Sequence, residues 1–259
     1  MITTEQAQRV ADRSRCLKVA DEHYEYQDFG FALNSTVIDF MLPTAAVRKA
    51  LAHYTDHCQA AIPTLASLES LLLEYHDNDK IGNSALAQHL WGYNLWTRAG
   101  LLRRLAAFCH DPSRSDLPSL REWSKAADFK KDFAGQVQYL APPMKRRMGL
   151  GPAVFAWLCM CLGDENRVKP DVQVVRFVKD ALGHDVTESD AAALVAKAAP
   201  LLKLSPRDLD WRIWEYQIAA ADGKGDARIV CAGQVAPSGS ATRCDLAGAA
   251  DTCLLSGVD

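Results

Sequence analysis

The chain has 259 residues, of which 49% are hydrophobic and 24% charged, as is typical of a globular protein with a core large enough for one or two domains. No apolar run reaches the roughly 18 residues of a membrane span, and the first residues are too polar for a secretory signal, so we expect a cytoplasmic protein without a membrane partner. A net charge of −3 excludes a uniformly basic surface of the kind that binds nucleic acid along its whole length.

Apolar residues recur at helical spacing along most of the chain, beginning after a capping-box pattern, Thr3-x-x-Gln6. Residues 28–41 are apolar but contain Asn34-Ser35-Thr36. This pattern predicts a helix that ends in a turn at these residues, with a new element beginning after the turn. The other expected helices lie in 3–24, 43–58, 64–76, 83–94, 97–110, 119–134, 152–162, 171–182, 188–204 and 206–219. Because alternating strand patterns are almost absent, the sequence predicts an all-α fold.

One helical domain is expected over residues 1–221. We expect its N-terminal helices to pack with 184–221, while 36–183 carries the helical core and a hairpin. Residues 222–259 are rich in Gly, Ala and Ser and show no sustained period, a composition typical of a disordered tail.

A sharp bend is expected at Gly149-Leu150-Gly151. Glycine permits backbone conformations that are closed to other residues and allows a close approach to another surface. Pro152 suits the first turn of a helix, and the following AVFAWLCMCL is apolar on every face, which predicts an interior helix. The free N–H groups at the start of such a helix form a natural phosphate site.

Positive charge is concentrated before this bend. Between Thr97 and Leu150 there are eleven Lys or Arg residues against five Asp or Glu, and Lys145, Arg146 and Arg147 directly precede the bend. A basic run of this kind is typical either of a phosphate contact or of a solvated helix face.

Asp171 follows Pro170 and begins an amphipathic helix that Gly183 ends. An aspartate there is typical of a helix N-cap. A catalytic carboxylate is the other interpretation, and the two are compatible because both require an ionised, oriented side chain.

The residues around the bend and Asp171 resemble the helix-hairpin-helix (HhH-GPD) DNA glycosylase superfamily. Its hairpin, Leu-Pro-Gly-Val-Gly-x-Lys-Thr-Ala, corresponds to residues 147–155, RMGLGPAVF, and its Val-Asp-Thr-His-Val-x-Arg to residues 170–176, PDVQVVR. Ala153, in the lysine slot, precedes Asp171 by 18 residues, as in the family. Weaker similarity at 32–39, 91–106 and 209–216 extends the resemblance over about residues 28–218.

The resemblance implies a two-lobed helical fold with a catalytic cleft between the lobes. It also implies a monomeric DNA glycosylase that hydrolyses the N-glycosidic bond of a flipped-out damaged or modified base in double-stranded DNA and leaves an abasic site. Asp171 would then be the catalytic carboxylate. The implied DNA contacts are Lys145, Arg146, Arg147, Met148, Gly149, Leu150, Gly151 and Ala153.

The departures from the family pattern limit the expected chemistry. Ala153 stands where bifunctional members carry the lysine that forms a Schiff base, which implies a hydrolase without lyase activity, although Lys145 or Lys169 remains a geometric substitute. Gln173 replaces a common histidine. The cysteine spacing of an iron–sulfur cluster is absent, so we expect no cofactor and no metal, apart from the monovalent cation that family members often bind at the hairpin.

The resemblance also suggests residues that could enter the base stack or line the base pocket. Thr36 and Asn94 fall where family members insert a wedge side chain, and each is also an ordinary turn residue. The aromatic pocket candidates, which could equally be core residues, are Trp91, Tyr93, Trp96 and Trp157.

Two other functions stay open at this point. A DNA-binding module could keep the fold without catalysis, and a glycosylase could release hypermodified bases from phage DNA in defence rather than repair host DNA. The identity of the base depends on the shape of the pocket, and oxidised purines, alkylated purines and modified pyrimidines all remain candidates.

Overall fold

The computed structural model describes residues 2–17, 25–75, 77–140 and 148–221, and the described part is mostly helical, which confirms the all-α expectation. Its α-helices are α1 (Thr4–Ser14), α2 (Phe29–Ile38), α3 (Thr44–His57), α4 (Leu65–Glu74), α5 (Lys80–Trp91), α6 (Trp96–Phe108), α7 (Leu117–Ala126), α8 (Pro152–Cys161), α9 (Val172–Leu182), α10 (Glu188–Ala198) and α11 (Pro206–Ala221). Short 3-10 turns η1 (Gln59–Ala61), η2 (Pro112–Arg114) and η4 (Ala199–Leu202) and a π-turn, η3 (Phe129–Phe133), join them. Within the described ranges, no helix combines the length and apolar character needed to cross a membrane.

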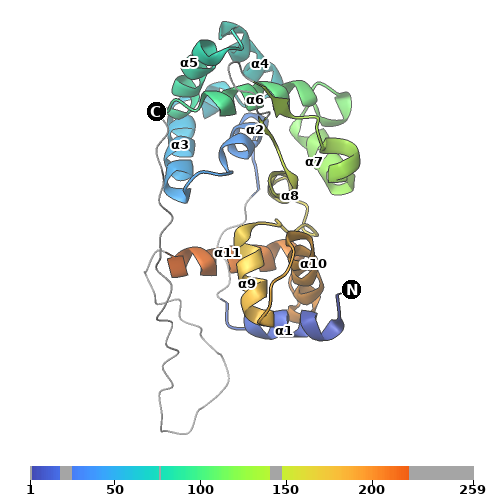
Figure 1. Ribbon diagram of the computed structural model, residues 1–259. Helices are drawn as coiled ribbons and strands as arrows, with labels where there is room; N and C mark the ends of the chain where they lie inside the picture. Colours follow the sequence, from blue (N-terminus) through green and yellow to red (C-terminus); the bar gives the residue numbers. More distant parts are fainter. Residues whose placement is uncertain (1, 18–24, 76, 141–147, 222–259) are drawn as a thin grey trace.

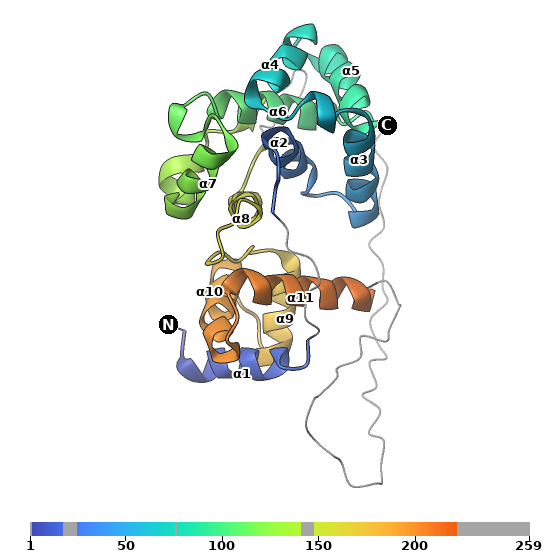
Figure 2. The same cartoon turned by 180° about the vertical axis from the view of Figure 1, so that it is seen from behind.

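The buried side chains form two hydrophobic cores. The first lies among α2–α8, and the second joins α1 to α9, α10 and α11. Figures 1 and 2 show the two groups of helices at opposite ends of the molecule, with α8 between them. The second core thus includes α9, although the sequence analysis assigned this helix to the 36–183 segment. The predicted tail, residues 222–259, lies outside the described part.

The expected break inside residues 28–41 is wrong, because α2 runs through it without interruption. Asn34 Nδ2 donates to the carbonyl of Gly30 at 2.9 Å, and Thr36 Oγ1 donates to that of Ala32 at 2.7 Å. These polar side chains bond back to their own helix and are fully buried with it, so they do not compete with the helical backbone.

The bend before α8 is built from a pair of short antiparallel strands. In it β1 (Gln138–Tyr139) pairs with β2 (Met148–Gly149), and the N–H of Leu150 donates to the carbonyl of Val137 at 3.3 Å. Gly149 and Gly151 both have negative φ, so the prediction that they adopt conformations reserved for glycine is wrong. Proximity is the constraint at Gly149, where an added Cβ would lie 3.3 Å from the Val137 oxygen.

The helix after the bend fits its apolar sequence. Pro152 occupies the first turn of α8, where its missing N–H costs nothing. Every residue from Val154 to Cys161 is buried. This buried helix fixes the position of the segment that follows it, which carries Asp171.

Candidate functional site

Asp171 is the N-cap of α9. Its Oδ1 accepts hydrogen bonds from the backbone N–H groups of Gln173 at 2.9 Å and Val174 at 3.1 Å. The second carboxylate oxygen, Oδ2, lies 3.7 Å from Nζ of Lys169. The cap therefore fixes the carboxylate through one oxygen and leaves the other facing a cation.

Lys169 connects Asp171 to a second carboxylate. Its Nζ lies 3.3 Å from Oδ2 of Asp39, the C-cap residue of α2. The side chains of Asp39, Asp171 and Lys169 are 26%, 18% and 14% exposed, so solvent reaches all three. The group lies where the end of α2, in the first core, meets the start of α9, in the second.

A third carboxyl group, that of Asp210 on α11, completes the surroundings of Lys169. Asp210 is 3% exposed, and it accepts a hydrogen bond from the backbone N–H of Lys169. Within the described residues, its Oδ1 has no hydrogen-bond partner. We call Asp39, Lys169, Asp171 and Asp210 the Lys169 cluster.

Tryptophan side chains form one wall of the Lys169 cluster. The ammonium group of Lys169 lies 4.7 Å from the ring centroid of Trp157 on α8, within range of a cation–π interaction. Trp157 is stacked on Trp211, and Trp211 on Trp214, with centroids 6.1 and 4.9 Å apart. One buried aromatic ring, that of Trp157, therefore lies against the charged groups of the cluster, and the other two tryptophans stack behind it.

Burial and repulsion by the charge of Asp171 raise the pKa values of two carboxyl groups in the cluster, those of Asp39 and Asp210. Burial raises the pKa of Asp39, as does the charge of Asp171, while Lys169 opposes both. Burial and Asp171 also raise the pKa of Asp210, well above its ordinary value. Burial acts to lower the pKa of Lys169, but the surrounding Asp39, Asp171 and Asp210 outweigh it, so that this pKa is raised and the lysine is charged at neutral pH.

The predicted DNA-contact residues are only partly described. Lys145, Arg146 and Arg147 lie outside the described residues. Leu150 is buried, Met148 and Ala153 are half-buried, and Gly149 is exposed. Among the described residues, a Cβ added at Gly151 would meet no atom within 4 Å, and no side chain caps α8.

Of the two wedge candidates, Thr36 lies inside α2 and is fully buried, so its predicted loop position is wrong. Asn94 is exposed in the turn between α5 and α6.

Of the aromatic candidates, Trp91 is a fully buried core residue. Tyr93 and Trp96 are half-buried and lie next to Lys49 and Tyr139 respectively, whereas Trp157 lies against Lys169.

Met41, in the connection from α2 to α3, is a residue that the sequence reasoning missed. It is 85% exposed and has φ = 54°, a left-handed conformation that is uncommon for a residue with a side chain. Arg98 of α6 supports the connection, since its Nη2 donates to the carbonyl of Phe40 at 2.6 Å and its guanidinium lies over the Phe40 ring. An apolar side chain is therefore held outward two residues from Asp39.

Asp39, Asp210, Trp211 and Trp214 were also missed as site residues. The signal available in the sequence was one aspartate in each of two largely apolar segments, ALNSTVID and LDWRIW. Periodicity alone does not show that these segments meet in space.

Among the described residues, no group of three or more His, Cys, Asp or Glu side chains could hold a metal ion. In the Lys169 cluster, the ammonium group takes the place between the carboxylates.

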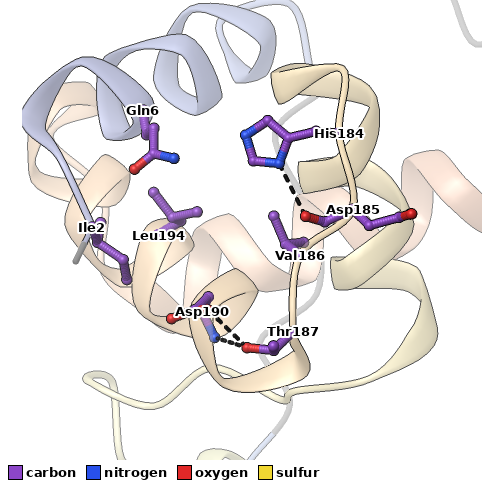
Figure 3. A pocket seen from close by; sticks show the side chains of 8 residues that line it. All are labelled: Ile2, Gln6, His184, Asp185, Val186, Thr187, Asp190 and Leu194. Atoms are coloured by element: carbon purple, nitrogen blue, oxygen red, sulfur yellow. Dashed lines mark hydrogen bonds between the residues drawn. The ribbon is translucent and has the colours of Figure 1, made fainter.

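A separate cavity of about 370 Å³ lies on the second core, between α1 and the start of α10 (Figure 3). Its polar groups are engaged locally: Thr187 Oγ1 caps α10 by accepting from the N–H of Asp190, and a ring nitrogen of His184 lies 2.9 Å from the carbonyl of Asp185. None of the Lys169 cluster lines it.

Comparison with known proteins gives one match. A family described as a domain of unknown function (DUF8548) matches residues 149–218. No curated protein and no solved structure matches the chain. The matched segment begins at the bend and contains Lys169, Asp171 and Asp210, whereas Asp39 lies outside it.

Proposed function

We propose that the protein is a monofunctional DNA glycosylase that hydrolyses the N-glycosidic bond of an extruded damaged or modified base. The observation that carries the proposal is the position of Asp171, whose carboxylate is fixed by two backbone N–H groups at the start of α9 and is 18% exposed at the junction of the two cores.

The chemistry requires a negative charge beside the sugar. As the bond from C1′ to the base nitrogen breaks, positive charge develops on the sugar, and a fixed carboxylate stabilises it. A water molecule then adds its oxygen to C1′ and passes a proton to Asp171. Backbone N–H groups hold this carboxylate in place, so that little reorganisation accompanies the reaction.

Two described features, near the bend and after α2, support contacts with a bent, opened duplex. The first turn of α8, which no described side chain caps, offers N–H groups to a phosphate. Met41 replaces Thr36 as the wedge candidate, because an exposed apolar side chain suits insertion between unstacked bases. Both features contact the DNA chain around the extruded nucleotide in this proposal.

Lyase chemistry is not part of the proposal. Ala153 has no amine, and Lys169 is held as an ammonium ion by three carboxyl groups, which makes it a poor nucleophile. Hydrolysis by water is the remaining route to an abasic site.

The test is release of free bases, detected by mass spectrometry, from genomic DNAs and duplexes that carry oxidised, alkylated, deaminated or phage-type modified bases. We expect the wild type to release at least one of them and Asp171→Asn to lose that release while still binding DNA. Asp116→Asn is the matched control, because Asp116 caps α7 in the same way, accepting from the N–H of Ser119, far along the chain from the cluster.

Each other outcome has a definite meaning. Undiminished release by Asp171→Asn removes this residue from the mechanism. DNA binding by the wild type without release of any base supports the non-catalytic module instead. Release confined to hypermodified phage DNA keeps the chemistry and indicates a role in defence.

A further inference from the structure

We infer that Asp39 is a second catalytic residue of this site, the general acid that protonates the departing base while Asp171 acts on the sugar and the water. The inference rests on the proposed function and adds to it a substrate class, because a proton donor is needed only for bases that leave as poor, uncharged leaving groups. It assigns the two roles to carboxyl groups from two helix ends, the C-cap of α2 and the N-cap of α9.

The first argument is the shared contact with Lys169. Oδ2 of Asp39 and Oδ2 of Asp171 lie 3.3 and 3.7 Å from the same nitrogen, so the two oxygens are no more than 7.0 Å apart. Paired carboxyl groups at roughly 5–9.5 Å flank the scissile bond in enzymes that cleave glycosidic bonds. The upper limit of 7.0 Å is compatible with one nucleotide that lies within reach of both carboxyl groups.

The second argument is the opposite electrostatic character of the two helix ends. Asp171 lies at the N-terminus of α9, where its Oδ1 accepts hydrogen bonds from two backbone N–H groups and faces the positive end of the helix dipole. Asp39 lies at the C-terminus of α2, where the carbonyl groups carry partial negative charge, which favours its neutral form. The local backbone thus distinguishes an acid from a base.

The remaining groups around Asp39 agree with this assignment. Buried Tyr26 and Cys161 both interact with Asp39 electrostatically, and since burial raises the pKa of each they stay uncharged. Arg98 contacts Phe40 through its carbonyl and its ring. Burial and the charge of Asp171 favour the protonated form of Asp39, whereas the positive charge of Lys169 favours the ionised form. The net effect is a raised pKa of Asp39.

The proton transfer balances within the site. Asp39 gives its proton to a ring nitrogen of the base as the C1′–N bond breaks, and the bonding electron pair leaves with the base. Water supplies the new C1′–O bond and one proton to Asp171. The charge that forms on Asp39 is then compensated by Lys169, 3.3 Å away.

The kinetic test compares two leaving groups under single-turnover conditions. One duplex carries N7-methylguanine, a cationic base that leaves without protonation, and the other carries hypoxanthine, a neutral base. We expect Asp39→Asn to slow release of hypoxanthine by about 100-fold or more and that of N7-methylguanine at least tenfold less. We expect Asp171→Asn to slow release of both bases. The control is Asp180→Asn, because Asp180 is an exposed aspartate of α9, the helix that Asp171 caps.

A second readout does not depend on activity. With ¹³C-labelled aspartate carboxyl groups, the NMR signal that disappears in Asp39→Asn identifies Asp39, and we expect its pKa above the ordinary value of about 3.9. Titration at or below that value overturns the assignment.

The kinetic outcomes separate this inference from the proposal beneath it. Equal losses for both bases in Asp39→Asn, or release by the wild type of the cationic base alone, overturn the acid role but keep the glycosylase. Absence of any base release by the wild type, with a raised Asp39 pKa, overturns the proposed function and the acid role with it.

Discussion

Asp39 and Lys169 lie 130 positions apart in the sequence, and a hydrogen bond of 3.3 Å from Nζ of Lys169 to Oδ2 of Asp39 joins the end of α2 to the segment that leads into α9. The first belongs to a helix of one hydrophobic core, and the second leads into a helix of the other. The Lys169 cluster consequently exists only when the two cores are packed together. Loss of this pairing changes both the stability of the fold and the charge at the candidate site.

Substituting Lys169 by methionine tests this link. The change leaves Asp39, Asp171 and Asp210 without their common cation, and we expect it to lower the free energy of unfolding at pH 7 by about 3 kcal/mol. The loss should shrink on acidification, as the carboxyl groups become protonated. Urea denaturation between pH 4 and 8 measures it, and a small, pH-independent loss would contradict the electrostatic explanation.

The same lysine predicts a loss of stability at high pH. Its pKa in the folded protein is raised above 10.5, so its contribution is complete below that value and is lost as the pH rises through the folded pKa. We expect the unfolding free energy of the wild type to fall more steeply above pH 10.5 than that of Lys169→Met. Lys125→Met, which removes an exposed partner of Glu122, serves as the control and should keep the wild-type slope.

The sequence correctly predicted several structural features that depend on neighbouring residues. Thr3 and Gln6 form the predicted capping box, and Pro152 and the all-apolar run after it give a buried helix. Asp171 is an N-cap, as one of its two interpretations requires. These features depend on residues within a few positions of one another, which is the range over which helix signals act.

Features that depend on contacts between distant segments could not be predicted from local sequence patterns. Thr36 looks like a turn residue, yet its hydroxyl bonds back to Ala32 inside a buried helix. The glycines at 149 and 151 suggested special backbone angles, whereas the feature observed at 149 is the close carbonyl of Val137, 3.3 Å from where a Cβ would lie. Asp39 and Asp210 gain their significance only from their common neighbour, Lys169.

Two substitutions of Asp171 distinguish its structural role as a helix cap from its proposed catalytic role. Because asparagine caps helices about as well as aspartate, we expect Asp171→Asn to keep the cap, whereas Asp171→Ala should lose about 1 kcal/mol of unfolding free energy. Both variants should lose base release. Retention of activity in the alanine variant would be incompatible with the proposed mechanism, and thermal or urea unfolding of the two proteins provides the comparison.

If the site has no reactive amine, the protein should form no covalent intermediate with DNA. When the wild type is incubated with an abasic-site duplex and borohydride, we expect no covalent protein–DNA adduct on a denaturing gel. The reason is that Ala153 has no amine and that the raised pKa of Lys169 keeps it protonated. An adduct that disappears in Lys169→Met would instead reveal lyase activity through this lysine.

Met41 offers a test in which stability and function should move apart. Glycine adopts left-handed φ values readily, and the 85% exposed side chain buries little surface, so we expect Met41→Gly to change the unfolding free energy by less than about 1 kcal/mol. Base release from duplex DNA should nevertheless slow, because the apolar wedge is gone. Lys203→Gly is the matched control, since Lys203 has a similar φ of 58° on the second core. If both variants slow release equally, relief of backbone strain rather than loss of the wedge explains the effect, and if neither does, Met41 does not enter the duplex.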